Sequence, residues 1–187
     1  HMGHAEYAAG GVDFSSGVSS PFTSVEQVLD FDPENAIGEP DHATTIRRFE
    51  AHYRDQVADF GDAVRLTGIY TTCVSGLIDL FGWDWLLLAA GTDPERFGRL
   101  TLRYNRWIRH FFEALADADV PVVMIHDDIV WSSGPFINPA WYRECVFPGY
   151  REHFGLLRES GKKILYTSDA DYSMFVDDIA ACGVHGF

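Results

Sequence analysis

The chain has 187 residues, of which 47% are hydrophobic and 14% aromatic, so it carries enough apolar side chains for a core of its own. Its 28 acidic and 14 basic residues give a formal net charge of −14. A nucleic-acid partner or an anionic membrane surface requires a basic patch, so the charge argues against both as partners.

The cysteines and the apolar runs of the sequence predict where in the cell the protein is located. Three cysteines, with no Cys-x-x-Cys pair among them, are typical of a reduced protein. The longest apolar run, residues 83–90, is shorter than the ~20 residues that a membrane helix needs. No basic segment followed by an apolar stretch begins the chain, so a signal peptide is not predicted. We therefore predict a cytoplasmic protein without a membrane partner.

The first 40 residues are predicted to be rich in loops, because Gly, Ser and Pro occur there in clusters. One short helix is predicted among them, capped by Ser24 and ending near Leu29. From residue 41 apolar residues recur every three or four positions, which predicts an amphipathic helix to about residue 60.

Strands and long helices then alternate along the chain. Alternation of this kind is typical of βα units around a parallel sheet, and long helices with short strands favour a (β/α)8 TIM barrel over a doubly wound open sheet. A closed barrel usually needs roughly 250 residues. We therefore predict that residues 1–187 form one partial barrel domain, with successive βα units from residue 41. The predicted elements are strand 64–70, helix 74–90, helix 94–117, strand 120–125, helix 139–160, strand 163–167, helix 173–182 and the start of a strand at 184–187.

Polar residues directly follow two of the predicted strands. His126, Asp127 and Asp128 end one strand, and Asp169 and Asp171 follow the next. The carboxyl ends of parallel strands meet at one mouth, where the chemistry of such folds collects. Crowded carboxylates raise one another's pKa values, so that one can hold a proton near neutral pH. The sequence therefore predicts general acid–base chemistry or a divalent cation held by oxygen ligands.

We predict catalytic roles for four of these residues. Asp127 and Asp128 would orient or protonate the reacting carbon, His126 would donate a proton, and Asp169 would be a second polar contact. Structural alternatives exist for two of them: Asp128 could bond the amides of the following loop, and His126 could be a hydrogen-bonded structural histidine.

Three further residues are predicted to bind substrate. Tyr70 ends its own strand, Trp131 could form a wall for a flat substrate, and Asp171 lies beyond the strand at 163–167. The alternatives are packing for the two rings and a helix N-cap for Asp171. Neither Cys73 nor Cys145 has a His or Cys at ligand spacing, so no zinc site is predicted and no residue is assigned as a metal ligand.

The stretch from Val120 to Phe187 resembles the uroporphyrinogen decarboxylase superfamily. A strand ending in DD is followed by SGPFINPAWYRE, FPGY, SGKKILYTSDAD and ACGVHGF, in the order and spacing of that superfamily. The segment from Leu66 to Glu95 fits it more loosely. The resemblance implies a (β/α)8 barrel with its site at the strand carboxyl ends, and a homodimer.

The superfamily contains two main chemistries. Decarboxylases remove carboxyl groups from the acetate arms of a tetrapyrrole without a cofactor, and methyltransferases move a methyl group to or from a corrinoid, usually with zinc. The chain departs from both. Thr167 and Asp169 stand where the methyltransferases have His-x-Cys, and residues 70–75 do not reproduce the Pro-Trp-Thr run of the decarboxylases.

The resemblance thus implies a divergent lyase that acts without a cofactor on a small carboxylated or tetrapyrrole-like molecule. One alternative is a corrinoid-dependent methyltransferase or demethylase of the same superfamily, with zinc or a corrinoid as cofactor. A second is a non-catalytic protein that binds a tetrapyrrole or corrinoid.

Overall fold

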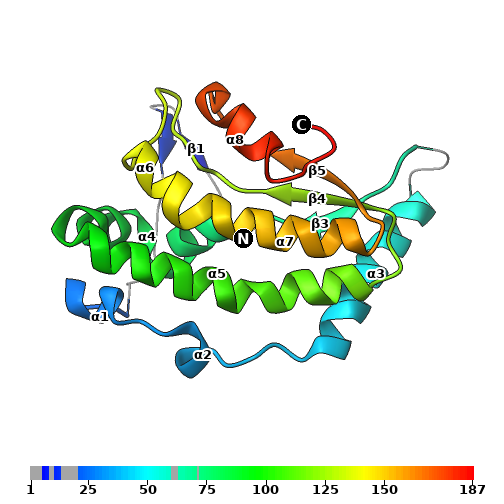
Figure 1. Ribbon diagram of the computed structural model, residues 1–187, viewed down its shortest axis with the longest axis horizontal. Helices are drawn as coiled ribbons and strands as arrows, with labels where there is room; N and C mark the ends of the chain where they lie inside the picture. Colours follow the sequence, from blue (N-terminus) through cyan, green and yellow to red (C-terminus); the bar gives the residue numbers. More distant parts are fainter. Residues whose placement is uncertain (1–5, 9–10, 14–20, 60–62, 71) are drawn as a thin grey trace.

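A parallel sheet lies at the centre of the computed structural model, which describes residues 6–8, 11–13, 21–59, 63–70 and 72–187. The strands have the order β3 (Thr67–Ile69), β4 (Val122–His126) and β5 (Lys163–Thr167). The long helices α5 (Pro94–Asp117) and α7 (Phe147–Glu159) run side by side along it (Figure 1). The described sheet is open and has three named strands, where a closed TIM barrel has eight.

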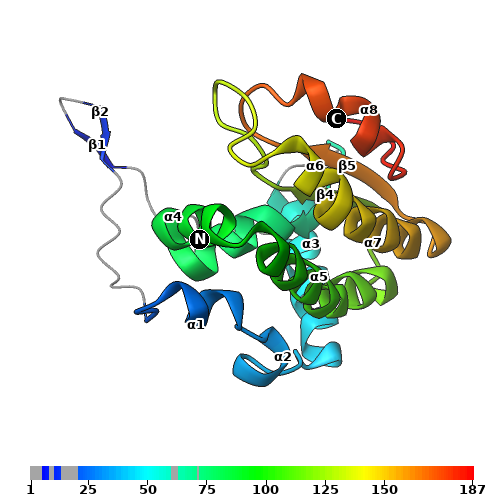
Figure 2. The same cartoon turned by 60° about the vertical axis from the view of Figure 1, so that its left-hand side comes forward.

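The remaining helices pack around this centre. Figure 2 shows α1 and α2 lying under α4 and α5, with which they are in contact. An antiparallel hairpin of β1 and β2 lies within the region predicted to be loops. The remaining elements are β1 (Glu6–Ala8), β2 (Gly11–Asp13), α1 (Val25–Leu29), α2 (Pro33–Ala36), α3 (His42–Asp59), α4 (Cys73–Thr92), α6 (Pro139–Trp141), a π-helical turn η1 (Tyr142–Val146), a 3-10 turn η2 (Ser173–Phe175) and α8 (Val176–Ala180).

Side chains cap three helix starts, and the cap predicted at Ser24 is one of them. Ser24 accepts a hydrogen bond from the N–H of Gln27 at the start of α1. Asp93 and Asn138 do the same at α5 and α6, and a proline directly follows each of them. These contacts satisfy N–H groups that the first turn of a helix leaves free.

Helix α4 contains a break that its sequence pattern did not predict. Gly82 has φ 76° and ψ 162°, which interrupts the helical path between two helical halves. In the described part of the chain α4 is long and apolar enough, by length and composition alone, to cross a membrane, and 50% of its most apolar window is buried in the fold. Its contacts with α1 and α5 account for that burial.

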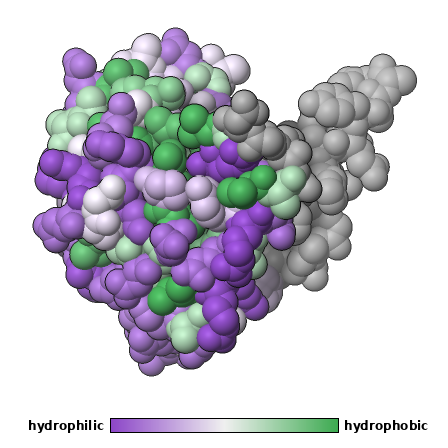
Figure 3. Space-filling model, turned by 90° about the vertical axis from the view of Figure 1, so that its right-hand side faces the viewer, coloured by the Kyte–Doolittle hydropathy of each residue, from purple (hydrophilic) through white to green (hydrophobic). Residues whose placement is uncertain are grey.

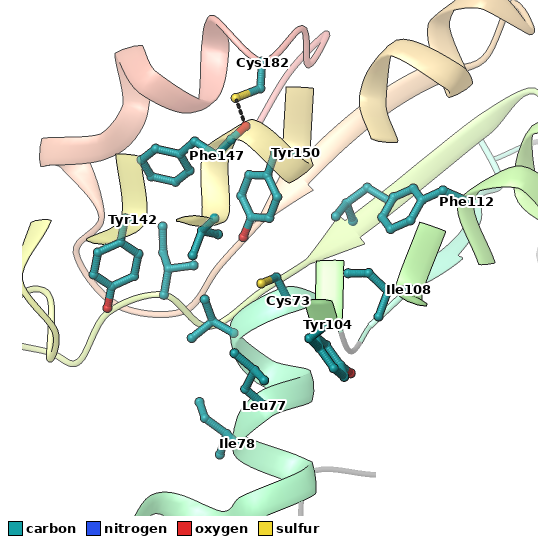
Figure 4. Packing of buried hydrophobic residues seen from close by; sticks show 14 of the residues in the cluster. Cys73, Leu77, Ile78, Tyr104, Ile108, Phe112, Tyr142, Phe147, Tyr150 and Cys182 are labelled. Atoms are coloured by element: carbon teal, nitrogen blue, oxygen red, sulfur yellow. Dashed lines mark hydrogen bonds between the residues drawn. The ribbon is translucent and has the colours of Figure 1, made fainter. Parts of the chain in front are cut away.

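The core lies between the helices and the sheet. Figure 4 shows side chains of α4, α5 and α7 meeting, among them Leu77, Ile108 and Tyr150, which are all buried. Tyr104 and Trp107 of α5 are also buried in this core. The face seen in Figure 3 is mainly hydrophilic, with apolar residues scattered over it.

Helix α7 begins after an irregular turn. A proline inside the predicted helix 139–160 would be expected to kink it, but the irregularity precedes Pro148, in the π-helical turn Tyr142–Val146. Pro148 lies in the first turn of α7, where its missing N–H is not needed.

The last residues begin the predicted fourth strand. His185 donates its N–H to the carbonyl of Ile164 at 2.8 Å, and Tyr166 donates to the carbonyl of Gly186 at 3.0 Å. Leu165 and Gly186 form an isolated parallel bridge. The chain therefore continues the sheet on the outer edge of β5.

Candidate active site at the strand ends

Three polar side chains meet where β4 and β5 end. His126 Nε2 lies 3.0 Å from Asp128 Oδ1, and the same oxygen accepts a hydrogen bond of 3.3 Å from the N–H of Asp169. One nitrogen or carboxylate oxygen from each residue lies within 4.8 Å of the other two. The parallel register, which pairs His126 with Thr167, brings them to one edge of the sheet.

The imidazole of His126 is held on both sides. Its Nδ1 lies 3.0 Å from the Thr167 hydroxyl, while Nε2 faces Asp128. The ring of Tyr70 lies parallel to it, with the centroids 4.2 Å apart and an interplanar angle of 2°. His126 is 5% exposed and Tyr70 is 48% exposed, so Tyr70 covers the histidine on the solvent side.

His126 and Asp128 each stabilise the charged form of the other. The hydrogen bond with Asp128 raises the pKa of His126 above its usual value, against the opposing effect of burial. Burial by itself raises the pKa of Asp128, but the hydrogen bonds from His126 and from the N–H of Asp169 outweigh it, so that pKa is lowered. The two side chains therefore favour an imidazolium–carboxylate pair.

Asp127 has different surroundings from its two neighbours. It is fully buried, and its carboxylate accepts hydrogen bonds from the N–H groups of Val74 and Ser75 and from the Tyr150 hydroxyl. Burial raises its pKa, although these hydrogen bonds act in the opposite direction. Among the described residues, its carboxylate has no hydrogen bond to the side chains of His126 or Asp128.

Trp131 and Asp171 lie in other local arrangements. Trp131 is 46% exposed and packs against Trp83 and Phe136, with both centroid distances at 5.5 Å. Asp171 is exposed and accepts a hydrogen bond of 3.0 Å from the N–H of Ser173, which lowers its pKa. Its observed contact is therefore a local turn bond to the first residue of the 3-10 turn, whose N-cap is Tyr172.

Several residues around the site were missed by sequence reasoning. The Thr72 hydroxyl donates to the carbonyl of His126 at 3.0 Å, and the Ser75 hydroxyl accepts from the N–H of Asp128 at 2.8 Å. A Thr-x-x-Ser sequence at the start of an apolar helix was the available signal for these two. Tyr150 gave no signal beyond its place in the helical pattern.

The cluster offers a donor set for a divalent cation. Two ligand atoms bound tetrahedrally about 2.1 Å from one ion lie roughly 3.4 Å apart. His126 Nε2 and Asp128 Oδ1 lie 3.0 Å apart, and all three ligand atoms of the cluster lie within 4.8 Å of one another. Asp169 is exposed and would supply the third ligand. The thiol of Cys73 is fully buried, and burial raises its pKa far above the usual value, so it does not suit thiolate ligation.

These features first define a class: an α/β protein whose polar cluster lies at the carboxyl ends of adjacent parallel strands, the usual place for an active site. The model of the uroporphyrinogen decarboxylase (URO-D) family matches residues 10–187. The chain therefore belongs to the URO-D family, and the match extends the resemblance to most of its length. No curated protein and no solved structure matches it.

Proposed function

We propose that the protein is a URO-D-like lyase that removes a carboxyl group from a small carboxylated or tetrapyrrole-like molecule by acid–base chemistry. The observation that carries the proposal is the His126–Asp128 pair, which holds a transferable proton beside the exposed carboxylate of Asp169. The proposal includes a (β/α)8 barrel, of which the described strands would form one part.

Each residue of the cluster then has a separate task. Loss of CO2 leaves a carbon that must take up one proton, and the His126 imidazolium supplies it before being recharged from solvent. Asp128 keeps the imidazole protonated and oriented. Asp169 provides a polar contact to substrate, and Tyr70 holds the imidazole plane while exposing its own edge. Asp127, predicted above to act on the reacting carbon, is instead assigned a supporting role because its carboxylate is buried.

A substitution at His126 tests this proposal. His126→Gln keeps a polar side chain but removes the titratable proton, so CO2 release from uroporphyrinogen or a smaller carboxylated pyrrole should fall roughly 100- to 10,000-fold. His42→Gln is the matched control, because His42 forms an exposed pair with Asp117 at 2.9 Å. Equal CO2 release from both variants would reject His126 as the proton donor.

The donor set of His126, Asp128 and Asp169 favours a second candidate, a metal-dependent methyltransferase or demethylase of the same superfamily. There the cation would polarise the group that gives or takes the methyl, and these three residues would hold it. Metal analysis of the purified protein separates the candidates. Stoichiometric metal that is lost in Asp169→Asn and kept in Asp171→Asn would support the methyltransferase, and its absence from the wild type would support the lyase.

A further inference from the structure

We propose that Asp127 is the positioning residue of this site. Its carboxylate fixes the first turn of α4 against the end of β4, and thereby holds His126 and Asp128 in the geometry described above. The functional consequence of this inference rests on the proposed role of that pair, but the geometric claim does not.

The first support comes from the contacts of the carboxylate itself. Oδ1 accepts from the N–H of Ser75 at 2.6 Å, and Oδ2 accepts from the N–H of Val74 at 3.0 Å and from the Tyr150 hydroxyl. A carboxylate at a helix N-terminus satisfies N–H groups that the first turn leaves free, and it interacts favourably with the helix dipole. Both carboxylate oxygens of Asp127 therefore accept hydrogen bonds from groups of α4 or α7.

The second support comes from contacts in the opposite direction. The first turn of α4 also binds the residues on either side of Asp127, through Thr72 to the carbonyl of His126 and through Ser75 to the N–H of Asp128. Three consecutive residues at the end of β4 are thus each tied to the same helical turn. A shift of that turn would move both members of the His126–Asp128 pair.

The third support is the position of Asp127 within the sheet. Its N–H donates to the carbonyl of Thr167 at 3.1 Å, and its carbonyl accepts from the Tyr166 hydroxyl at 3.2 Å. Thr167 is also the residue whose hydroxyl faces His126 Nδ1. Asp127 therefore joins β4, β5, α4 and α7 at the level of the site.

Asp127→Asn tests the inference in the folded 187-residue protein by NMR. An amide keeps one acceptor oxygen but turns an NH2 group toward N–H donors, so the link to α4 loosens. We expect hydrogen exchange at the amides of Val74 and Ser75 to become roughly tenfold faster or more. The ring protons of His126, shifted by the parallel ring of Tyr70, should lose more than half of that ring-current shift.

Two further variants keep the test decisive. Leu157→Ala removes a buried core side chain of α7 without touching this link, so it should lower stability and leave the His126 ring shifts unchanged. Tyr150→Phe removes one hydrogen bond to Asp127 and should give a smaller change of the same sign, which is the readout if Asp127→Asn does not fold.

Unchanged His126 ring shifts in both Asp127→Asn and Tyr150→Phe would overturn the inference, since Asp127 would then contribute only to stability. The measurement needs no substrate. A wild-type protein without decarboxylase activity would therefore refute the proposed function and leave the positioning role intact. Unchanged His126 ring shifts would refute the positioning role and leave the proposed function intact.

Discussion

Two buried histidines in this protein have opposite environments. His126 is hydrogen-bonded to Asp128, and this bond raises the pKa of its imidazole. His153 stacks on Phe112 at a centroid distance of 4.4 Å, and its Nε2 lies 3.1 Å from the carbonyl of Asn105. Its Nδ1 has no hydrogen-bond partner among the described residues, and burial lowers its pKa to about 4. The surroundings of each ring, and not the residue type, decide whether it carries charge.

The environment of His153 predicts a loss of stability in acid. The folded protein keeps this ring neutral down to a pKa of about 4, whereas the unfolded chain binds a proton below its ordinary pKa of 6.5. Its contribution is therefore fully present above pH 6.5 and is lost as pH falls toward 4, by about 3 kcal/mol in total. Urea unfolding from pH 4 to 7 should show this slope in the wild type and a weaker one in His153→Gln. Parallel curves for the two proteins would contradict the assignment.

At the scale of elements, β3 and β4 approach each other closely at Gly68. A Cβ at this position would overlap the backbone carbonyl of Met124, its partner in the parallel register. A backbone group on a central strand cannot move aside as a flexible side chain can. Glycine is therefore required here by the neighbouring strand, in contrast to Gly155 in α7, where a Cβ would meet nothing within 4 Å.

Gly68→Ala is expected to separate the two strands and to destabilise the protein by several kcal/mol, about the size of a severe overpacking defect. Gly155→Ala is the control, and should stabilise α7 by about 0.5–1 kcal/mol because alanine loses less backbone entropy in a helix. Chemical denaturation of both variants measures the difference. Equal stabilities would show that β3 can shift without cost.

Much of this element structure was predictable. Asp93-Pro94 and Asn138-Pro139 encode local caps, and apolar spacing gave the long helices and the three parallel strands. The break at Gly82, the π-helical turn and the β1–β2 hairpin were not predicted, because a glycine or a helical apolar pattern does not specify such a departure. These features depend on packing between segments far apart in sequence.

The candidate site was predictable in the same partial way. Parallel strands imply that residues at their carboxyl ends meet, and His126, Asp128 and Asp169 do. The separate direction of the Asp127 side chain could have been inferred, since side chains alternate along a strand and Asp127 shares a face with the buried Ile125. Its contact with Tyr150 could not, because nothing in the spacing of α7 identifies that partner.

At the scale of the whole molecule, hydrogen bonds from α5 hold the segment that precedes α3 against that helix. The guanidinium of Arg103 donates to the carbonyls of Leu29 and Phe31, at the end of α1. Farther along α5, the indole of Trp107 donates to the carbonyl of Gly38 at 2.8 Å. These contacts satisfy carbonyl groups that a short helix and its following turn would otherwise leave to solvent.

Arg103→Met should release this segment, because the apolar stem is retained while the charged donors are lost. Hydrogen bonds that involve a charged group contribute about 1.5–3 kcal/mol. We expect faster proteolysis within residues 21–41 and a lower melting temperature. Arg106→Met, at an exposed position on the same helix, is the control. Similar cleavage rates for the two variants would argue that the apolar contacts of the segment hold it without Arg103.

The π-helical turn between α6 and α7 is a position where the length of this chain can change by one residue. Such a turn accommodates one residue more than an α-helical path, and each residue of an α-helix advances the chain by about 100°. Deleting Glu144 would therefore convert the turn into a regular α-helical path and leave Trp141 stacked on Phe97, where the ring centroids are 5.3 Å apart. Glu144 is exposed, so its side chain is open to replacement. Its backbone supplies the additional residue of the turn, so the chain should tolerate losing one residue here far better than within α7, where a deletion would rotate the preceding side chains by about 100°.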